Sequence, residues 1–219
     1  MAARGRGAAP YHLLVAAKPP RLGRPPASSS VETRGRIVGV ARRCFADCGY
    51  EATTNRMLAS EAGITTAAIY HYFDSKLDIY KAVLDEVQEQ VYQLFATAEG
   101  EATTFLTKLS AVYEVAYDLN RADATLARFL GSSRIDRLRD PELAAALGVS
   151  DTRGEGFFEA IVDCGIATGE VDKADREPLI SLIRAFNIGL TDGLSADHRE
   201  HRQAVDGFLL LLGGYVAEN

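Results

Sequence analysis

TTNRMLASEAGITTAAIYHYFDSK, residues Thr53–Lys76, is the most informative stretch of this chain. It predicts two short helices joined by a tight turn, the first over about Asn55–Glu61 and the second over about Thr66–Tyr72. Gly63 is expected to end the first helix, because a residue without Cβ adopts a left-handed conformation at little cost. The small Ala62 beside it lets the two helices cross closely. This is the arrangement of a helix-turn-helix unit.

Threonine hydroxyls are the expected caps of both helices, Thr54 for the first and Thr65 for the second. Ser75 is the expected cap of the helix that follows, with Asp78 three residues on. The side of the second helix that is left exposed carries small or polar groups and one ring: Thr65, Thr66, Ala67, Tyr70 and His71. Such groups suit phosphates, base edges and thymine methyls in a major groove. Taken alone, the stretch fits a helical hairpin inside a larger bundle equally well.

The flanking residues decide between these interpretations. The run Arg36–Tyr80, RIVGVARRCFADCGYEATTNRMLASEAGITTAAIYHYFDSKLDIY, closely resembles the N-terminal DNA-binding domain of the TetR family of bacterial transcription regulators. The resemblance covers about Thr33–Tyr80 with many matches at fixed spacing, and it fades to a general helical layout over the rest of the chain. It implies a homodimeric regulator whose heads bind a double-stranded DNA operator and whose body binds a small effector.

The resemblance also assigns DNA contacts to matching positions of this chain. Thr53, Thr54 and Arg56 are expected at the phosphate backbone, and Lys76 matches a common phosphate-contacting lysine. Thr65, Thr66 and Ala67 are the expected base readers, and Tyr70 and His71 share their exposed face. That face has no arginine to grip guanine with two hydrogen bonds, so specificity is expected to rely on apolar contacts and DNA shape.

Charge is unevenly distributed along the 219 residues. Residues 1–31 hold five basic side chains and no acid, residues 32–80 hold six of each, and residues 81–219 hold 13 bases and 24 acids. The basic first segment is rich in Gly, Pro, Ala and Ser, and we expect it to be disordered. Its Arg21–Pro26 run resembles basic hooks that lie in a narrow minor groove. The alternatives are a passive tail or a start codon placed too early.

Composition narrows the class of protein further. Hydrophobic residues make up 47% of the chain and charged residues 25%, as in soluble globular proteins. No apolar run reaches the roughly 18 residues of a membrane span, and Met1–Ala17 lacks the features of a signal peptide. We therefore expect a cytoplasmic protein with no membrane partner. Cys44 and Cys48 are expected to act as small apolar filler, in preference to a disulfide or a metal pair.

The predicted fold is all-α, with a disordered basic tail at 1–31, a helix-turn-helix domain at 32–78 and a helical effector-binding and dimerisation domain at 79–219. The charged run Arg134–Asp140 is expected to be a solvated connection, and Pro141 to start a short turn that Gly148 ends. Helical spacing predicts the longer helices at about 32–47, 75–97, 103–119, 122–132, 151–168, 176–194 and 197–216.

By resemblance, a mostly apolar pocket among the body helices binds the effector. Its expected lining is Tyr92, Phe95, Tyr113, Tyr117, Phe129, Phe157, Phe158, Ile161, Phe186 and Asn187. Ordinary core packing is the alternative for each of these residues. Asp118, Arg184 and Asn187 are polar groups in otherwise apolar stripes, so one of them could orient a ligand. Exposure to solvent or to an interface explains them equally well.

The last two predicted helices carry apolar faces with small residues. By resemblance, they pair with their mates in a four-helix dimer interface. Gly189 and Gly193 permit close helix approach at roughly 1 kcal/mol each in helix propensity. The expected interface residues are Leu182, Gly189, Leu190, Gly193, Phe208, Leu212 and Tyr215. The alternative is a core within one chain.

These patterns predict a repressor that a small apolar effector releases from its operator. One alternative is a DNA-binding regulator without an effector, and another is a helical enzyme that uses the body pocket. We expect no enzyme and no cofactor, because the sequence has no nucleophile elbow, phosphate loop or paired-cysteine cluster. The run Asp197–His201 fits a solvated face better than a metal site.

Overall fold

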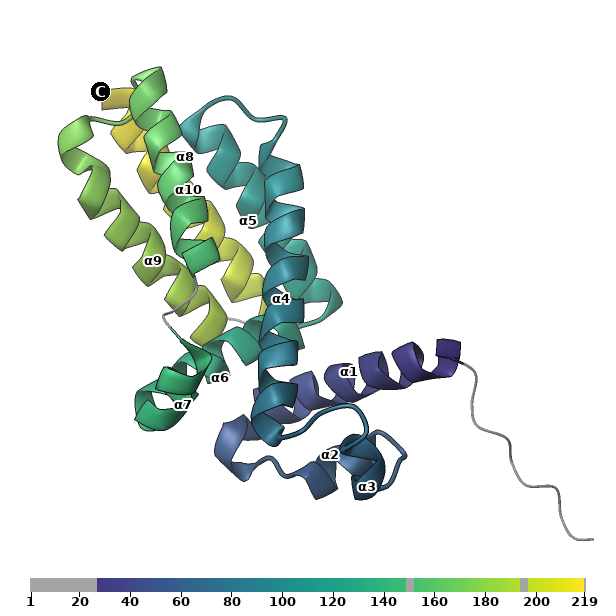
Figure 1. The fold of residues 1–219 in the computed structure, drawn as a ribbon. Coiled ribbons are helices and arrows are strands. Elements are labelled where there is room, and N and C mark those ends of the chain that lie inside the picture. Colours follow the sequence, from purple (N-terminus) through teal and green to yellow (C-terminus); the bar gives the residue numbers. More distant parts are fainter. Residues whose placement is uncertain (1–26, 149–151, 194–196, 219) are drawn as a thin grey trace, which may run out of the picture.

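The computed structural model describes residues 27–148, 152–193 and 197–218. Within those ranges every regular element is a helix, which confirms the predicted all-α fold (Figure 1). Most of the predicted basic tail, up to residue 26, lies outside them. The elements are α1 (Ala27–Ala52), α2 (Asn55–Glu61), α3 (Thr66–Ile69), α4 (Lys76–Glu99), α5 (Phe105–Ala122), α6 (Thr125–Arg139), α7 (Pro141–Leu147), α8 (Thr152–Thr168), the short 3-10 helix η1 (Lys173–Asp175), α9 (Arg176–Asp192) and α10 (His198–Glu218).

Helices α1 to α3 form a small head around an apolar core. Helix α1 begins at Ala27, before the predicted start at residue 32, and its regular path ends at Gly49, where φ is +77°. Gly49 is needed for space as well as for conformation, because an added Cβ would lie 2.9 Å from Oδ1 of Asp136. The head core consists of Ile37, Val38, Ala41, Phe45, Leu58, Ala59 and Ile69.

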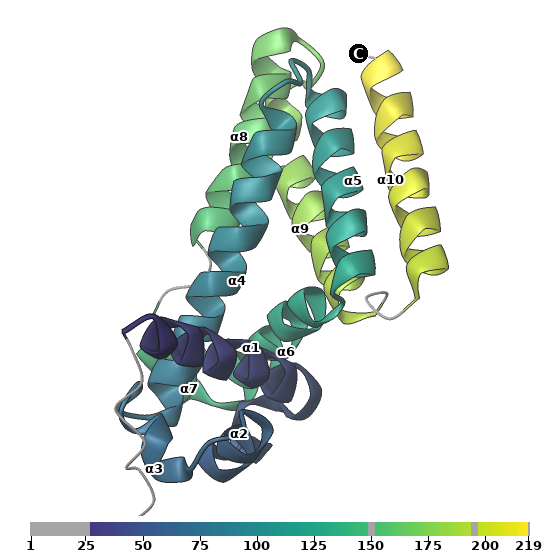
Figure 2. The same ribbon diagram turned by 90° about the vertical axis from the view of Figure 1, so that its right-hand side faces the viewer.

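Helix α4 links the head to the body. Ser75 caps its first turn by accepting a hydrogen bond from the backbone N–H of Asp78 at 3.1 Å, as the sequence predicts. The helix then runs from the head along the body, where α5, α8, α9 and α10 lie (Figures 1 and 2). Helix α5 packs against α4, α8 and α10, and α6 lies at the head end of the body against α1 and α9.

An aromatic cluster joins the head to the body. The ring of Tyr80 on α4 lies 4.8 Å from that of Phe45, 5.1 Å from that of Tyr50 and 5.4 Å from that of Phe129 on α6, measured between centroids. The pairs with Phe45 and Tyr50 are edge-on, and such contacts are favourable in addition to the area that they bury. Head and body therefore share one continuous core.

The predicted solvated connection at Arg134–Asp140 is wrong. Helix α6 continues through Arg139, because charged side chains of this run have partners in distant parts of the chain. Arg134 forms an ion pair with Asp192 on α9, and Asp136 accepts hydrogen bonds from the head. Among the described helices none has the length and apolar character to cross a membrane.

Candidate nucleic-acid interface and internal cavity

The helix-turn-helix unit forms as the sequence predicts. The hydroxyl of Thr54 accepts a hydrogen bond from the N–H of Met57 at 3.2 Å, and that of Thr65 accepts one from Ala68 at 3.1 Å. Gly63 makes the turn between the two helices with φ of +67°. Regular helix in α3 ends at Ile69, earlier than the predicted Tyr72, and tight turns continue the coil beyond it.

The outward face of α3 is open to solvent. Thr65, Ala67, Tyr70 and His71 are exposed, and Thr66 is half-buried. Tyr70 keeps 55% of its surface, and its hydroxyl accepts a hydrogen bond from the amide of Asn55 on α2 at 3.1 Å. This bond fixes the direction of a ring that would otherwise be free to turn.

Two residues of α2 lie in this region but are absent from the sequence-based prediction. Asn55 positions Tyr70, and Met57 is 38% exposed, beside the exposed Arg56. The sequence does offer a hint that Met57 is exposed. It lies on the polar side of a short helix, where an exposed thioether is unusual. The hydrogen bond between Asn55 and Tyr70 joins two helices, so no pattern within either helix could have predicted it.

The structure corrects the prediction for Thr53. Its side chain is fully buried, and its hydroxyl donates to the carbonyl oxygen of Gly49 at 2.8 Å. A buried hydroxyl that already donates to the backbone cannot reach a phosphate. Thr53 instead closes the C-terminal end of α1, whereas its neighbours Thr54 and Arg56 are exposed.

Lys76 is directed toward the same end of α1. Its Nζ donates to the carbonyl oxygens of Tyr50 at 2.7 Å and Glu51 at 3.3 Å, and it lies 4.2 Å from the centre of the Tyr50 ring. A lysine ammonium has three donors. Two of its N–H groups thus hold the end of α1 against the start of α4, and the third is not used in these two bonds.

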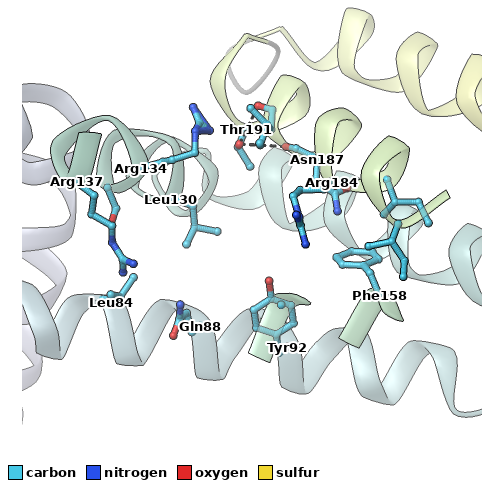
Figure 3. Close-up of a pocket in the computed structure, with 15 residues that line it drawn as sticks. Leu84, Gln88, Tyr92, Leu130, Arg134, Arg137, Phe158, Arg184, Asn187 and Thr191 are labelled. Atoms are coloured by element: carbon cyan, nitrogen blue, oxygen red, sulfur yellow. Dashed lines mark hydrogen bonds between the residues drawn. The ribbon is translucent and has the colours of Figure 1, made fainter. Parts of the chain in front are cut away.

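The body contains a half-open cavity of about 290 Å³ between α4, α6, α8 and α9 (Figure 3). Figure 3 shows Gln88 and Tyr92 extending from α4 toward Leu130 and Arg184 on the opposite walls. The lining consists of Leu84, Gln88, Tyr92, Leu130, Ser133, Arg134, Arg137, Gly154, Phe158, Ile180, Ile183, Arg184, Asn187, Ile188 and Thr191. Its size is near the lower end of small-molecule sites.

This lining differs from the predicted one. Of the expected residues, Tyr92, Phe158 and Asn187 line the cavity. The others pack elsewhere: Phe95, Tyr113, Phe129 and Ile161 are buried in the core, Phe157 lies against Tyr92 and Phe95, Phe186 stacks on Phe208, and Tyr117 lies beside His201. Aromatic rings fill space efficiently. Most of the predicted aromatic residues therefore pack into the core, and other residues form the wall of the cavity.

One buried tyrosine outside the cavity orients a residue that lines it. The hydroxyl of Tyr113 donates to Oδ1 of Asn187 at 3.0 Å. Burial raises the pKa of Tyr113, so its hydroxyl stays protonated and keeps donating. The amide nitrogen of Asn187 consequently remains as a donor at this site.

Two of the four helices that line the cavity, α4 and α6, also contact the head. Helix α4 lines the cavity with Leu84, Gln88 and Tyr92, and about one turn before Leu84 it places Tyr80 in the aromatic junction. Helix α6 lines it with Arg134 and Arg137. On the same helix, Ser132 donates to the carbonyl oxygen of Phe45 at 3.0 Å.

The head carries the sequence signature that identifies the chain. The family model described as bacterial regulatory proteins, tetR family, matches residues 37–83, which span most of α1, all of α2 and α3, and the start of α4. This head belongs to the TetR family.

Curated TetR-family relatives match this chain over part of their length. The transcriptional activator FasR of Mycolicibacterium smegmatis is 29% identical over 132 residues, or 60% of this chain and 58% of that protein. The transcriptional repressor KstR2 of the same organism is 30% identical over 91 residues, or 42% of this chain and 44% of that protein. The chain thus aligns with about half the length of these relatives.

The fold also matches solved TetR-like structures. A TetR-like transcriptional regulator from Rhodococcus sp. RHA1 superposes with a TM-score of 0.70 over 91% of this chain and 100% of that chain, at 16% identity. This likeness concerns the fold alone. It extends the similarity from the TetR head to the helical body.

The predicted dimer residues lie in two different environments, some exposed and some buried. Leu182, Gly189 and Gly193 are exposed on α9, in line with an interface. Leu190, Phe208 and Leu212 are buried within the protomer and offer little surface to a partner. The half-buried Tyr215 donates its hydroxyl to Asp175 at 2.6 Å.

The exposed apolar residues of the last two helices are a better guide to an interface. Leu210 and Leu211 on α10 are 77% and 74% exposed, and Leu182 on α9 is 48% exposed. Leucines this exposed are unusual when they gather on neighbouring elements of a protein. Helical spacing alone did not show which side of each helix faces the core.

The histidine-rich run at the start of α10 is also placed differently from the prediction. His198 is exposed, but His201 is buried, and its Nδ1 lies 3.0 Å from Nδ2 of Asn120 on α5. Among the described residues no group of three or more His, Cys, Asp or Glu side chains is arranged to hold a metal ion.

Proposed function

We propose that this protein is a sequence-specific DNA-binding transcription regulator that a small ligand in the body cavity releases from its operator. The observation that carries the proposal is the exposed face of α3 within a head that matches the tetR family model. Such a face has the size and the side chains to enter a major groove.

The proposed contacts follow from exposure. Thr54, Arg56 and Lys76 approach phosphates, which positions the head, and Thr65, Thr66 and Ala67 meet base edges. Tyr70 and His71 flank them on the same face. Because residues 32–80 carry six basic and six acidic side chains, affinity depends on a few placed groups and little on net charge.

A homodimer is the second part of the proposal. Its support is the exposed apolar residues of α9 and α10, with Gly189 and Gly193 offering close helix approach. A two-fold dimer would present two copies of α3 to half-sites about one helical turn apart, roughly 34–36 Å. Bound to an operator, this regulator would work in the cytoplasm.

Ligand release is proposed to act through α4 and α6, because both line the cavity and both contact the head. A ligand that prefers one arrangement of these helices would favour a head spacing that mismatches the operator. The coupling is reciprocal, so operator DNA would weaken ligand binding by the same factor. A cavity with defined polar groups favours this proposal over a regulator without an effector.

We propose a repressor. A regulator bound at its operator blocks transcription, and a ligand that releases the regulator removes that block. The relatives include an activator and a repressor, FasR and KstR2, so the direction of regulation needs its own measurement. A reporter gene placed behind the selected operator gives that direction.

The experiment that tests DNA recognition is selection of bound fragments from a random pool of double-stranded DNA. The expected result is a two-fold symmetric motif whose half-sites lie about one helical turn apart. A pool that shows no enrichment after several rounds would overturn the proposal, and an unsymmetric motif would overturn its dimeric part.

A further inference from the structure

The wall of the cavity is unbalanced in charge. Arg134, Arg137 and Arg184 all line it, and the lining includes no Asp or Glu. A guanidinium remains protonated at any physiological pH. The cavity therefore carries positive charge on two of its walls, α6 and α9, which the sequence-based expectation of an apolar effector does not explain.

The three arginines differ in how many ion pairs and hydrogen bonds they already form within the protein. Arg134 forms an ion pair with Asp192 next to the cavity, and Arg184 also has a partner within the protein. Arg137 forms no ion pair with any described residue, and its Nε is buried without a hydrogen-bond partner among them. Of the three guanidinium groups, that of Arg137 thus has the most N–H groups free to bind a ligand.

The remainder of the wall is apolar. Leu84, Leu130 and Phe158 lie around the space in Figure 3, and Ile180 and Ile183 complete this side. Gln88, Asn187 and Thr191 add a few neutral polar groups. One part of a ligand would therefore be buried against hydrocarbon while another part lies near cations.

A purely apolar ligand would be a poor occupant. By filling the cavity it would remove water from the guanidinium of Arg137 and provide no hydrogen-bond acceptor in return. Covering a charge without a partner is costly, whereas pairing it with a carboxylate or phosphate offsets that cost. Planar guanidinium groups suit both anions, because two N–H groups can donate to two oxygens.

We propose that the cavity binds an amphipathic anion, with Arg137 holding a carboxylate or phosphate head and the apolar wall holding its hydrocarbon body. The inference rests on the proposed function, since it names the class of ligand that would release the operator. It concerns binding to the free protein as well, and so can be tested with no DNA present.

The test compares ligands that share one chain and differ in the head. Thermal unfolding and titration calorimetry of the full chain are measured with decanoate, decyl phosphate and decan-1-ol, and with acetate and inorganic phosphate as head groups alone. The expected result is that one decyl anion, or both, binds at least about tenfold more tightly than decan-1-ol. The preferred anion shows whether the natural head is a carboxylate or a phosphate.

Matched variants then locate the anion. Arg137→Gln should lose the preference for the anion over decan-1-ol, and Arg137→Lys should keep part of it because the charge remains. Arg139→Gln is the control, since Arg139 is exposed on the same helix and does not line the cavity. The Arg137→Lys variant keeps the comparison valid if Arg137→Gln is poorly folded.

The outcomes separate this inference from the proposed function. Equal binding of decan-1-ol, absence of binding by every decyl compound, or an unchanged preference in both Arg137 variants would overturn the inference, whatever the DNA result. A preserved anion preference in a protein that selects no DNA would instead overturn only the proposed regulator. If both hold, the preferred anion should also release the selected operator in a gel-shift assay.

Discussion

The carboxylate of Asp136 on α6 accepts a hydrogen bond from the hydroxyl of Tyr80 on α4, with 3.0 Å between Oη and Oδ2. The same oxygen accepts the backbone N–H of Tyr50, at the end of α1, at 2.9 Å. Burial raises the pKa of Tyr80, so its hydroxyl remains a donor. One oxygen thus connects α4 and α6, two of the helices that line the cavity, to the end of α1 in the head.

Asp136→Asn should weaken that connection. An amide retains one acceptor oxygen and exposes two N–H groups to the donors that Asp136 now satisfies, so we expect a loss of about 1–3 kcal/mol in the free energy of unfolding. Urea unfolding measures this loss of stability, with Asp118→Asn on the exposed face of α5 as the control.

In a gel-shift assay the Asp136→Asn variant should also respond less to a releasing ligand. An unchanged unfolding curve would show that this contact contributes nothing to stability.

Tyr70→Ala should weaken operator binding by about 1–3 kcal/mol, a size typical of a lost contact to DNA, without lowering the melting temperature. The reason is that Tyr70 is 55% exposed and contributes little to the core. Asn55→Ala should reproduce part of this loss, because it frees the Tyr70 ring. Gel shifts on the selected operator measure both variants. Wild-type affinity for Tyr70→Ala would remove this residue from the interface.

Lys76→Ala should behave differently from Tyr70→Ala. It removes a phosphate donor and also two hydrogen bonds to the end of α1, at 2.7 and 3.3 Å, so both affinity and head stability should fall. Gel shift together with thermal unfolding distinguishes the two variants. A loss of affinity with full stability would show that Lys76 acts only on DNA.

His201 should make stability sensitive to pH. Burial lowers its pKa below the ordinary 6.5, and the nearby His198 adds to this shift. Because the unfolded chain then binds a proton more readily than the folded protein, this contribution is complete above about pH 6.5 and is lost as pH falls toward the folded-state pKa. Urea unfolding across this range should show a flatter pH dependence for His201→Gln than for the wild type. His198→Gln, at an exposed site on the same helix, should retain most of the wild-type slope.

Leu211→Arg should convert the proposed dimer to a monomer and abolish operator binding. A charge placed at the centre of an apolar interface has no partner, whereas on a free surface it is harmless. Leu138→Arg is the matched control, since Leu138 is 75% exposed on α6 and Leu211 is 74% exposed on α10. Light scattering measures the oligomeric state. A dimeric Leu211→Arg protein would place the interface elsewhere.

Removal of residues 1–26 should lower operator affinity and reduce its salt dependence, because all five basic residues of the segment lie in this range. The deletion ends there so that α1, which starts at Ala27, stays whole. Affinity measured at several salt concentrations tests this prediction. Equal slopes for both proteins would show that the segment is passive on DNA.

Sequence reasoning succeeded where the cause of structure is local. Thr54, Gly63, Thr65 and Ser75 cap or terminate their helices as predicted, since each acts on backbone groups within a few residues. Helical spacing also located the main helices of the body. These signals depend only weakly on the remainder of the chain.

The errors share one cause, which is that the burial of a side chain depends on how segments of the chain pack against one another. Thr53 became a core residue because the end of α1 offers it a carbonyl acceptor. His201 became buried because Asn120 on α5 faces it. Neither partner can be recognised from the spacing of residues along one helix.

The amino-acid sequence by itself determined the helix-turn-helix head, its caps and its exposed face, because the contacts that form them lie close together along the chain. Only the tertiary structure decided the function of the charged run around Arg134–Asp140. Packing of α6 between the head and α9 turned Asp136 toward Tyr80 and placed Arg134 and Arg137 on the cavity wall. The position of a charged side chain on a helix does not specify which group it will pair with. The packing of the helices against one another decides that.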